Sequence, residues 1–280
     1  MPRSADTLLE PLTAAMAGIS ALLLIGMIGF LLAESWPALA HGNWLRFAGL
    51  AWYPLEGQFG LAAMGIATLA VAALAILLAA PLGLACALFA RFQAPPALAG
   101  GFRGLLALMA GVPSVVYGFW GLTVLVPLVA RWQPPGASLF TAGLVLALMI
   151  LPTVALLAHA ALAAVPRGLL DGAAALGLSR RTTLLKVAVP AARRGIVGGV
   201  LLGLARALGE TMAVLMVAGN VVQLPASVFD PVRVLTANIA LEMAYATDTH
   251  RAGLFVSGLL LALLALGLAW FAARLEPRHA

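Results

Sequence analysis

An arginine and a glutamate stand four residues apart inside an apolar run. The stretch ARALGETMAVLM (205–216) contains Arg206 and Glu210, and apolar residues flank it on both sides. A charged side chain at the centre of a bilayer costs about 2.5–3.5 kcal/mol on insertion scales, so such a residue faces protein or water. Two interpretations follow. Either the pair joins helices, or one or both residues line a solute path, in which Arg206 would favour an anion.

A second polar group occurs in VPSVVYGFWGL (112–122), which contains Pro113, Ser114 and Tyr117. Counted from the cytoplasmic starts of their spans at 1.5 Å per residue, Pro113 and Arg206 both lie about 15–16 Å deep. Proline removes a backbone donor, and irregular backbone at this depth lines a cavity or packs within protein. Hydroxyls, freed amides and an arginine at one depth suit an oxyanion. The alternative is a kinked helix whose small residues allow close packing.

The composition is that of a membrane protein. Of 280 residues, 63% are hydrophobic and 9% are charged, whereas soluble domains carry about 25% charged residues. The net charge of +6 arises between apolar runs, so it indicates membrane topology and no nucleic-acid partner. A single cysteine, Cys86, excludes an intramolecular disulfide. The histidines lack metal-ligand spacing, so we expect no metal site.

Six apolar segments are long enough to cross a bilayer. They cover about 12–33, 60–89, 104–130, 139–165, 196–218 and 252–273. Of the 16 Lys and Arg residues, eleven fall on the side of both termini, four on the other, and Arg206 within a span. The positive-inside rule therefore places both termini in the cytoplasm. The first segment is longer than the ~7–15 apolar residues of a signal peptide, so we expect a retained helix.

The segments between the spans complete this picture. The outer loop 34–59 is rich in tryptophan, as is usual at membrane interfaces, and 234–245 is predicted to form a short helix in the other outer loop. We divide the chain into 1–58, a transmembrane helix with its periplasmic loop, and 59–275, the main transmembrane domain. The latter contains a basic cytoplasmic loop at about 166–195.

The basic loop has signals for two short helices. Asp171 is a candidate N-cap for a helix at 172–178, and Ser179 for one at 180–189 that Pro190 would interrupt. The alternative is an ordinary positively charged cytoplasmic loop that binds no partner. Small residues in the first helix would let a partner surface approach closely, and the adjacent arginines add charge.

The spacing in this loop resembles a known pattern. It reads D-G-A, three residues, G, nine residues, V-A-V-P, and is similar to the EAA loop of ABC importer permeases: E-A-A, three residues, G, nine residues, I-x-L-P. It departs from that pattern at Asp171 and Gly172. The resemblance implies a MetI-like type I permease fold and a coupling helix that docks on an ATP-binding subunit. The residues implied in coupling are Asp171, Gly172, Ala173, Ala174, Gly177, Leu178 and Pro190.

Three further stretches narrow the resemblance. VPSVVYGFWGL, LALMILPTV (146–154) and LGLARALGETMAVLMVAGN (202–220) are similar to the PstC-type permease subunits of phosphate ABC importers. The sister PstA-type subunits differ after Gly-Glu-Thr. The resemblance covers about 60–273. It implies a phosphate path served by Arg206 and Glu210, and we add Thr211, Pro113, Ser114 and Tyr117 as candidates.

The resemblance also implies function and partners. The chain would be a permease subunit of an ATP-driven phosphate importer in the bacterial inner membrane. Its partners would be a PstA-type subunit, two copies of an ATP-binding subunit and a periplasmic phosphate-binding protein. The sequence has no G-x-x-x-x-G-K-[ST] motif, so it is not expected to be an enzyme; we expect no cofactor on this chain and ATP–Mg on the partner ATPase.

Three alternatives remain open. A permease for sulfate, molybdate or tungstate would share the loop and the fold. A proton-coupled secondary transporter is favoured only by Glu210, and the sequence shows no inverted repeat of the kind such transporters often have. If the chain were a membrane scaffold that does not transport, replacing Arg206 with alanine would leave uptake intact while damaging assembly.

Overall fold

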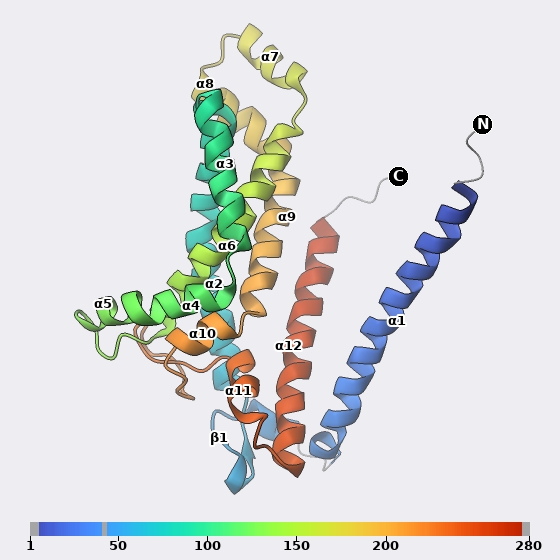
Figure 1. Cartoon of the computed structure of the whole chain (residues 1–280), viewed down its shortest axis with the longest axis vertical. Helices are drawn as coiled ribbons and strands as arrows, with labels where there is room; N and C mark the ends of the chain where they lie inside the picture. Colours follow the sequence, from blue (N-terminus) through green and yellow to red (C-terminus); the bar gives the residue numbers. More distant parts are fainter. Residues whose placement is uncertain (1–5, 41–43, 276–280) are drawn as a thin grey trace.

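A computed structural model of the chain describes residues 6–40 and 44–275. It is a bundle of helices with one small two-stranded antiparallel sheet at one end (Figure 1). The elements are α1 (Asp6–Leu39), η1 (Trp44–Ala48), β1 (Trp52–Tyr53), η2 (Pro54–Glu56), β2 (Gln58–Phe59), α2 (Ala62–Leu88), η3 (Phe89–Gln93), α3 (Pro96–Gly111), α4 (Ser114–Trp120), η4 (Gly121–Leu125), α5 (Val126–Ala130), α6 (Leu139–Ala163), α7 (Arg167–Ala175), α8 (Arg180–Thr183), η5 (Leu184–Ala188), α9 (Val189–Leu208), α10 (Met212–Val217), α11 (Leu235–Glu242) and α12 (Asp248–Leu275).

The predicted spans correspond to long apolar helices. In the described residues, five helices are long and apolar enough to cross a membrane: Leu9–Leu39, Ala62–Gln93, Leu139–Ala163, Arg180–Leu208 and Asp248–Ala272. The predicted span 104–130 corresponds to a pair of segments, Ala97–Gly111 and Ser114–Ala130, bent by 91° at the break between them. The all-α membrane class is therefore confirmed, and the predicted span 104–130 is broken at Val112 and Pro113.

The break in this span follows from its proline. Val112 is extended, with φ −66° and ψ 128°, and Pro113 has φ −60° and ψ 141°. A residue before proline avoids the α region, and proline has no N–H to continue the helix. The Tyr117 hydroxyl donates a hydrogen bond of 2.9 Å to the Met109 carbonyl across the bend. This bond fixes the bend between α3 and α4.

The helix that contains Arg206 is longer than predicted. It begins at Arg180, well before residue 196, and continues without a gap through α8, η5 and α9. The prediction that Pro190 interrupts it is wrong. The preceding turn, η5, is a π-helical turn in which Val189 N donates to Leu184 O, five residues back. The wider turn moves the preceding carbonyls away from the proline ring, so the helix accepts Pro190 in its first α-helical turn.

Helix α6 forms the centre of the bundle, between α2 and α9. Two glycines of α9 let it approach closely. A Cβ added to Gly199 would lie 2.9 Å from Leu157 Cβ, and one added to Gly203 would lie 2.9 Å from Val154 Cγ2. Small residues four apart are the usual means of close helix packing in membranes. Gly199 and Gly203, the glycine stripe of α9, therefore fix how α9 packs against α6.

Helices α1 and α12 stand at the side of this bundle (Figure 1). They pack along each other, with the rings of Phe30 and Phe255 edge to face at 5.7 Å. None of the most apolar 18-residue window of α1 is buried. The N-terminal end of α1 and the C-terminal end of α12 both point toward the side of the molecule that carries α7 (Figure 1). An even number of membrane crossings requires this arrangement.

The basic loop folds differently from its prediction. Helix α7 begins at Arg167, directly after Pro166, and contains Asp171 in its interior. Asp171 is therefore not an N-cap, because the proline already starts the helix four residues earlier. The prediction for Ser179 is confirmed: its hydroxyl accepts the Thr182 backbone N–H of α8 at 3.3 Å. The predicted helix at 234–245 is confirmed as α11.

Candidate functional site

Arg206 lies in the last turn of α9, and α6 supplies its partner. Its Nη1 donates a hydrogen bond of 3.1 Å to the Thr153 hydroxyl. The arginine is half-buried. Because its partner is a neutral hydroxyl, this contact orients the guanidinium without compensating its charge. An anion near this position would meet a full positive charge in a medium of low dielectric constant.

A spacing of four residues would place Arg206 and Glu210 on one face of a continuous helix, but the helix ends between them. Helix α9 ends at Leu208, so the two side chains belong to different segments. Glu210 Oε1 accepts the Ala213 backbone N–H of α10 at 3.1 Å. Among the ion pairs of the described residues, none joins Glu210 to Arg206. The carboxylate instead serves as a cap for an otherwise unpaired amide at the start of α10.

The connection between α9 and α10 is a second break in a span. Residues 209–211 lie outside both helices, and the Thr236 hydroxyl donates to the Glu210 carbonyl at 2.8 Å. The Thr211 hydroxyl lies 3.5 Å from the Gly209 carbonyl, the limit of a hydrogen bond. Non-helical backbone at membrane depth occurs where it is buried in protein or lines a water-filled cavity. The break therefore lies in the stretch that contains Arg206, Glu210 and Thr211, the residues predicted to line a solute path.

The other predicted pathway residues surround the bend after α3. Pro113 forms the bend itself, and Ser114 begins α4 with a half-buried side chain that makes no hydrogen bond within the described residues. The Tyr117 hydroxyl already donates to Met109 O, so toward a solute it can act only as an acceptor. Of the predicted residues, Ser114 has a hydroxyl free to donate to an oxyanion.

The two breaks come together in space. Helices α4 and α10, which follow the breaks, pack against each other below the end of α9 (Figure 1). Tyr117 packs against the hydrophobic cluster that contains Ala207 and Leu208, the two residues directly after Arg206. The structure thus brings Arg206 and Tyr117 into one region, while Glu210 is turned toward α10. The arrangement can attract an anion and offer it hydroxyl groups, but it contains no nucleophile paired with a general base.

The predicted coupling residues lie at the opposite end of α9 from Arg206. Most of this loop is exposed: Leu176 has 81% of its surface accessible, whereas Ala173 is buried against its neighbours. Gly177 has φ +72°, a conformation that other L-residues rarely adopt. The predicted set is placed as follows: Asp171, Gly172, Ala173 and Ala174 in α7, Gly177 and Leu178 in the turn after it, and Pro190 in the first turn of α9.

Sequence reasoning missed Thr153. It stands directly after a proline in LALMILPTV, and a threonine in an apolar helix often bonds its own backbone, so its type alone did not select it. Its role depends on α6 and α9 being neighbours, which the sequence does not reveal for two residues 53 positions apart. The signal available was its depth in the fourth span, comparable with that of Arg206.

Sequence reasoning also missed a buried polar cluster at the other end of the molecule. The Glu242 carboxylate of α11 accepts from Arg233 Nη1 at 2.7 Å and from Trp52 Nε1 at 2.8 Å, and it lies 2.8 Å from His250 Nε2. Arg233 also donates to Asn238 Oδ1 at 3.2 Å. The cluster joins the hairpin, α11 and α12. In the described residues no group of three or more His, Cys, Asp or Glu side chains could hold a metal ion.

Two solved structures with a similar fold are ABC transporters. An inward-facing structure of the MetNI methionine ABC transporter aligns with a TM-score of 0.64, 17% identity, and coverage of 80% of this chain and 97% of that chain. A bacterial alginate ABC transporter aligns with a TM-score of 0.58, 16% identity, and coverage of 93% and 94%. These likenesses confirm the predicted permease fold.

Relatives by sequence are permease proteins. The probable ABC transporter permease protein YqgH of Bacillus subtilis is 42% identical over 202 residues, 71% of this chain and 65% of that protein. The phosphate transport system permease proteins PstC of Pasteurella multocida and Haemophilus influenzae are each 34% identical, covering 84% and 91% of this chain and 82% and 88% of theirs. The family described as binding-protein-dependent transport system inner membrane component matches residues 79–280. The chain is therefore a multi-pass inner-membrane permease, not an enzyme, and belongs to the family of inner-membrane components of binding-protein-dependent transport systems.

Proposed function

We propose that this chain is a permease subunit of an ATP-driven phosphate importer, with both termini in the cytoplasm. The observation that carries the proposal is Arg206, a half-buried cation at a helix break whose partner is the neutral Thr153 hydroxyl. A charge at this depth is costly unless it faces the protein interior or a water-filled solute path. The names of the PstC relatives supply phosphate as the substrate.

The geometry around Arg206 suits transient passage of an anion. The guanidinium lowers the barrier for a phosphate at mid-membrane, and the Ser114 hydroxyl at the start of α4 is a further donor with no hydrogen bond within the described residues. A single uncompensated charge attracts the anion without the several donors that would trap it. Conduction requires binding that is strong enough to enter and weak enough to leave.

Transport of this kind needs partners. We propose a PstA-type subunit as the other half of the path, two copies of an ATP-binding subunit and a periplasmic phosphate-binding protein. ATP–Mg would be held by the ATP-binding subunits and no cofactor by this chain. The exposed leucine Leu176 and the glycine turn at Gly177 form the surface that would dock on the ATPase, with Asp171 and Leu178 beside them. Helices α8 and α9 lead from that surface to Arg206.

The test is uptake by the reconstituted importer. The complete complex is placed in liposomes with ATP inside and phosphate-loaded binding protein outside. We expect Arg206→Ala to reduce phosphate uptake by more than tenfold, and Thr153→Val by about tenfold or more, since a hydrogen bond to a charged group contributes about 1.5–3 kcal/mol. Thr153→Ser, which keeps the hydroxyl, should retain uptake.

Arg131→Ala is the matched control, because Arg131 is an exposed arginine in the turn after α5. It should leave uptake unchanged. Unchanged uptake in Arg206→Ala would remove the pathway assignment. Sulfate or molybdate carried as fast as phosphate would instead favour the related oxyanion permeases, and uptake that needs a proton gradient but no ATP would favour a secondary transporter.

A further inference from the structure

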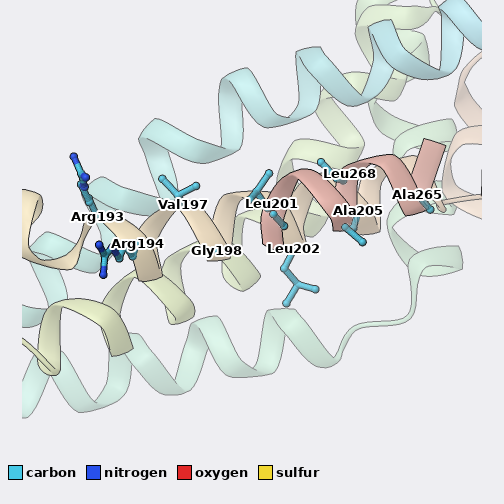
Figure 2. A pocket seen from close by; sticks show the side chains of 11 residues that line it. Arg193, Arg194, Val197, Gly198, Leu201, Leu202, Ala205, Ala265 and Leu268 are labelled. Atoms are coloured by element: carbon cyan, nitrogen blue, oxygen red, sulfur yellow. The ribbon is translucent and has the colours of Figure 1, made fainter. Parts of the chain in front are cut away.

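A groove between α9 and α12 has no role in the proposed function. It has a volume of about 680 Å³. Apart from two arginines, every residue that lines it is aliphatic or glycine, including Val197, Leu201 and Leu268 (Figure 2). It lies on a different side of α9 from the glycine stripe: a Cβ added to Gly198 would meet nothing within 4 Å, whereas one on Gly199 would press on α6.

The two arginines stand at one end of the groove. Figure 2 shows Arg193 and Arg194 together at the end toward the start of α9, with the aliphatic side chains following in order from there. Neither arginine forms a hydrogen bond or an ion pair with another described residue. The groove therefore combines an uncompensated double positive charge with an apolar channel.

The dimensions match one leaflet of a bilayer. From Arg194 to Ala205, at the far end, α9 rises by about 16 Å at 1.5 Å per residue. Half of a ~30 Å hydrocarbon core is about 15 Å. The arginines then lie at the level of the headgroups and Ala205 at the midplane. Helix α1 does not fill this groove, because its contacts follow another part of α12, around Phe255 and Gly258.

We propose that this groove binds an anionic phospholipid from the leaflet on the side of α7. The phosphate lies between Arg193 and Arg194, and an acyl chain lies along Val197, Leu201 and Leu268. Basic pockets between helices on the cytoplasmic side are suited to anionic headgroups. Free phosphate would use only the arginines and leave the apolar length of the groove empty, so the lipid is the occupant that fits the whole site.

The test compares lipids on the complete transporter. The purified complex is exposed to equal amounts of phosphatidylglycerol and phosphatidylcholine, and bound lipid per complex is counted by native mass spectrometry. We expect retained phosphatidylglycerol at a one-to-one ratio with this chain. The double variant Arg193→Gln, Arg194→Gln should lose about 30-fold in apparent affinity, from roughly 1 kcal/mol per charge near an anionic surface. Millimolar inorganic phosphate should not displace the lipid.

Two control variants separate charge from shape. Lys186→Gln with Arg274→Gln removes two exposed charges outside the groove and should leave retention unchanged. Gly198→Leu with Ala269→Leu keeps both groove arginines but fills the groove, and should abolish retention in a complex of unchanged thermal stability. Equal retention of the two lipids by the unmodified complex, or displacement by inorganic phosphate, would overturn the proposal. So would efficient disulfide formation between the variant Leu201→Cys and a cysteine introduced in a helix of the partner permease, because a protein segment would then occupy the groove.

Discussion

Gly118 of α4 and Ala213 of α10 bring the two broken spans into backbone contact. A Cβ on Gly118 would lie 2.8 Å from Ala213 Cα and 3.0 Å from Met216 Sδ. The nearest atom belongs to the main chain and not to a flexible side chain, so it cannot move aside alone. This contact holds the segment after Pro113 against the segment after Glu210, and so it sets the distance between the two breaks near Arg206.

Gly118→Val should separate these helices. Overpacking of this kind costs about 1–3 kcal/mol, and the displaced α4 would move Ser114 and Tyr117 relative to Arg206. We expect a lower melting temperature of the purified complex and a loss of most phosphate uptake. Gly104→Val is the matched control, since Gly104 lies in α3 with nothing within 4 Å of an added Cβ. Equal behaviour of the two variants would show that the contact is dispensable.

Two substitutions can distinguish whether Glu210 acts through its acceptor oxygen or through its negative charge. Its carboxylate accepts the Ala213 N–H, and glutamine keeps an oxygen at that place whereas alanine does not. We expect Glu210→Gln to retain at least half of the uptake. Glu210→Ala should lose stability by about 1 kcal/mol, the usual effect of removing a cap, together with most of the uptake. If the glutamine variant is as inactive as the alanine variant, the negative charge itself is required, and the proton-coupled alternative gains support.

The coupling loop offers a matched pair of glycines. Gly177 has φ +72°, so Gly177→Ala would strain the backbone by about 1–2 kcal/mol and reorient the turn after α7. Gly172 lies inside α7 with open space around it, and Gly172→Ala should stabilise that helix by about 1 kcal/mol. We expect transport-coupled ATP hydrolysis to fall severalfold in the first variant and to be kept in the second. The reverse order would argue against α7 and its turn as the docking surface.

The polar cluster around Glu242 should be important for stability rather than for transport chemistry. Replacing Glu242 with alanine leaves Arg233 without its carboxylate in a mostly buried site, a change that typically costs about 3–5 kcal/mol. Glu34→Ala removes an exposed pair with Arg251 at 3.7 Å and should cost less than about 1 kcal/mol. Thermal unfolding of the two variants, followed by tryptophan fluorescence, measures this difference. A similar melting temperature for both would contradict the importance of the cluster.

The parts that the sequence predicted depend on local rules. The apolar lengths of the spans, the break at Pro113 and the Ser179 cap each follow from a few neighbouring residues. The error at Asp171 was also local: Pro166 is the stronger start signal, and it places Asp171 inside α7. The roles assigned to the pathway and coupling residues, and the division at residue 58, stay predictions.

The remaining features depend on how distant segments pack. Nothing near Arg206 in the sequence identifies Thr153 as its partner, and Trp52 meets Glu242 across 190 positions. The end of α9 at Leu208 was missed because the chain stays apolar on both sides and Gly209 alone is a weak stop signal. A pair four residues apart looks like a helical pair until tertiary contacts show the break between them.

The π-helical turn η5 has a mechanical consequence. Because it admits Pro190 without ending the helix, the helix from Arg180 to Arg206 is continuous and about 39 Å long along its path. A continuous helix passes motion from one of its ends to the other. If the ATPase tilts its cytoplasmic end by about 10°, the other end swings by about 7 Å, calculated from the same length. A small movement at the coupling surface would thus move Arg206 past a solute about the size of a phosphate ion, with no unfolding in between.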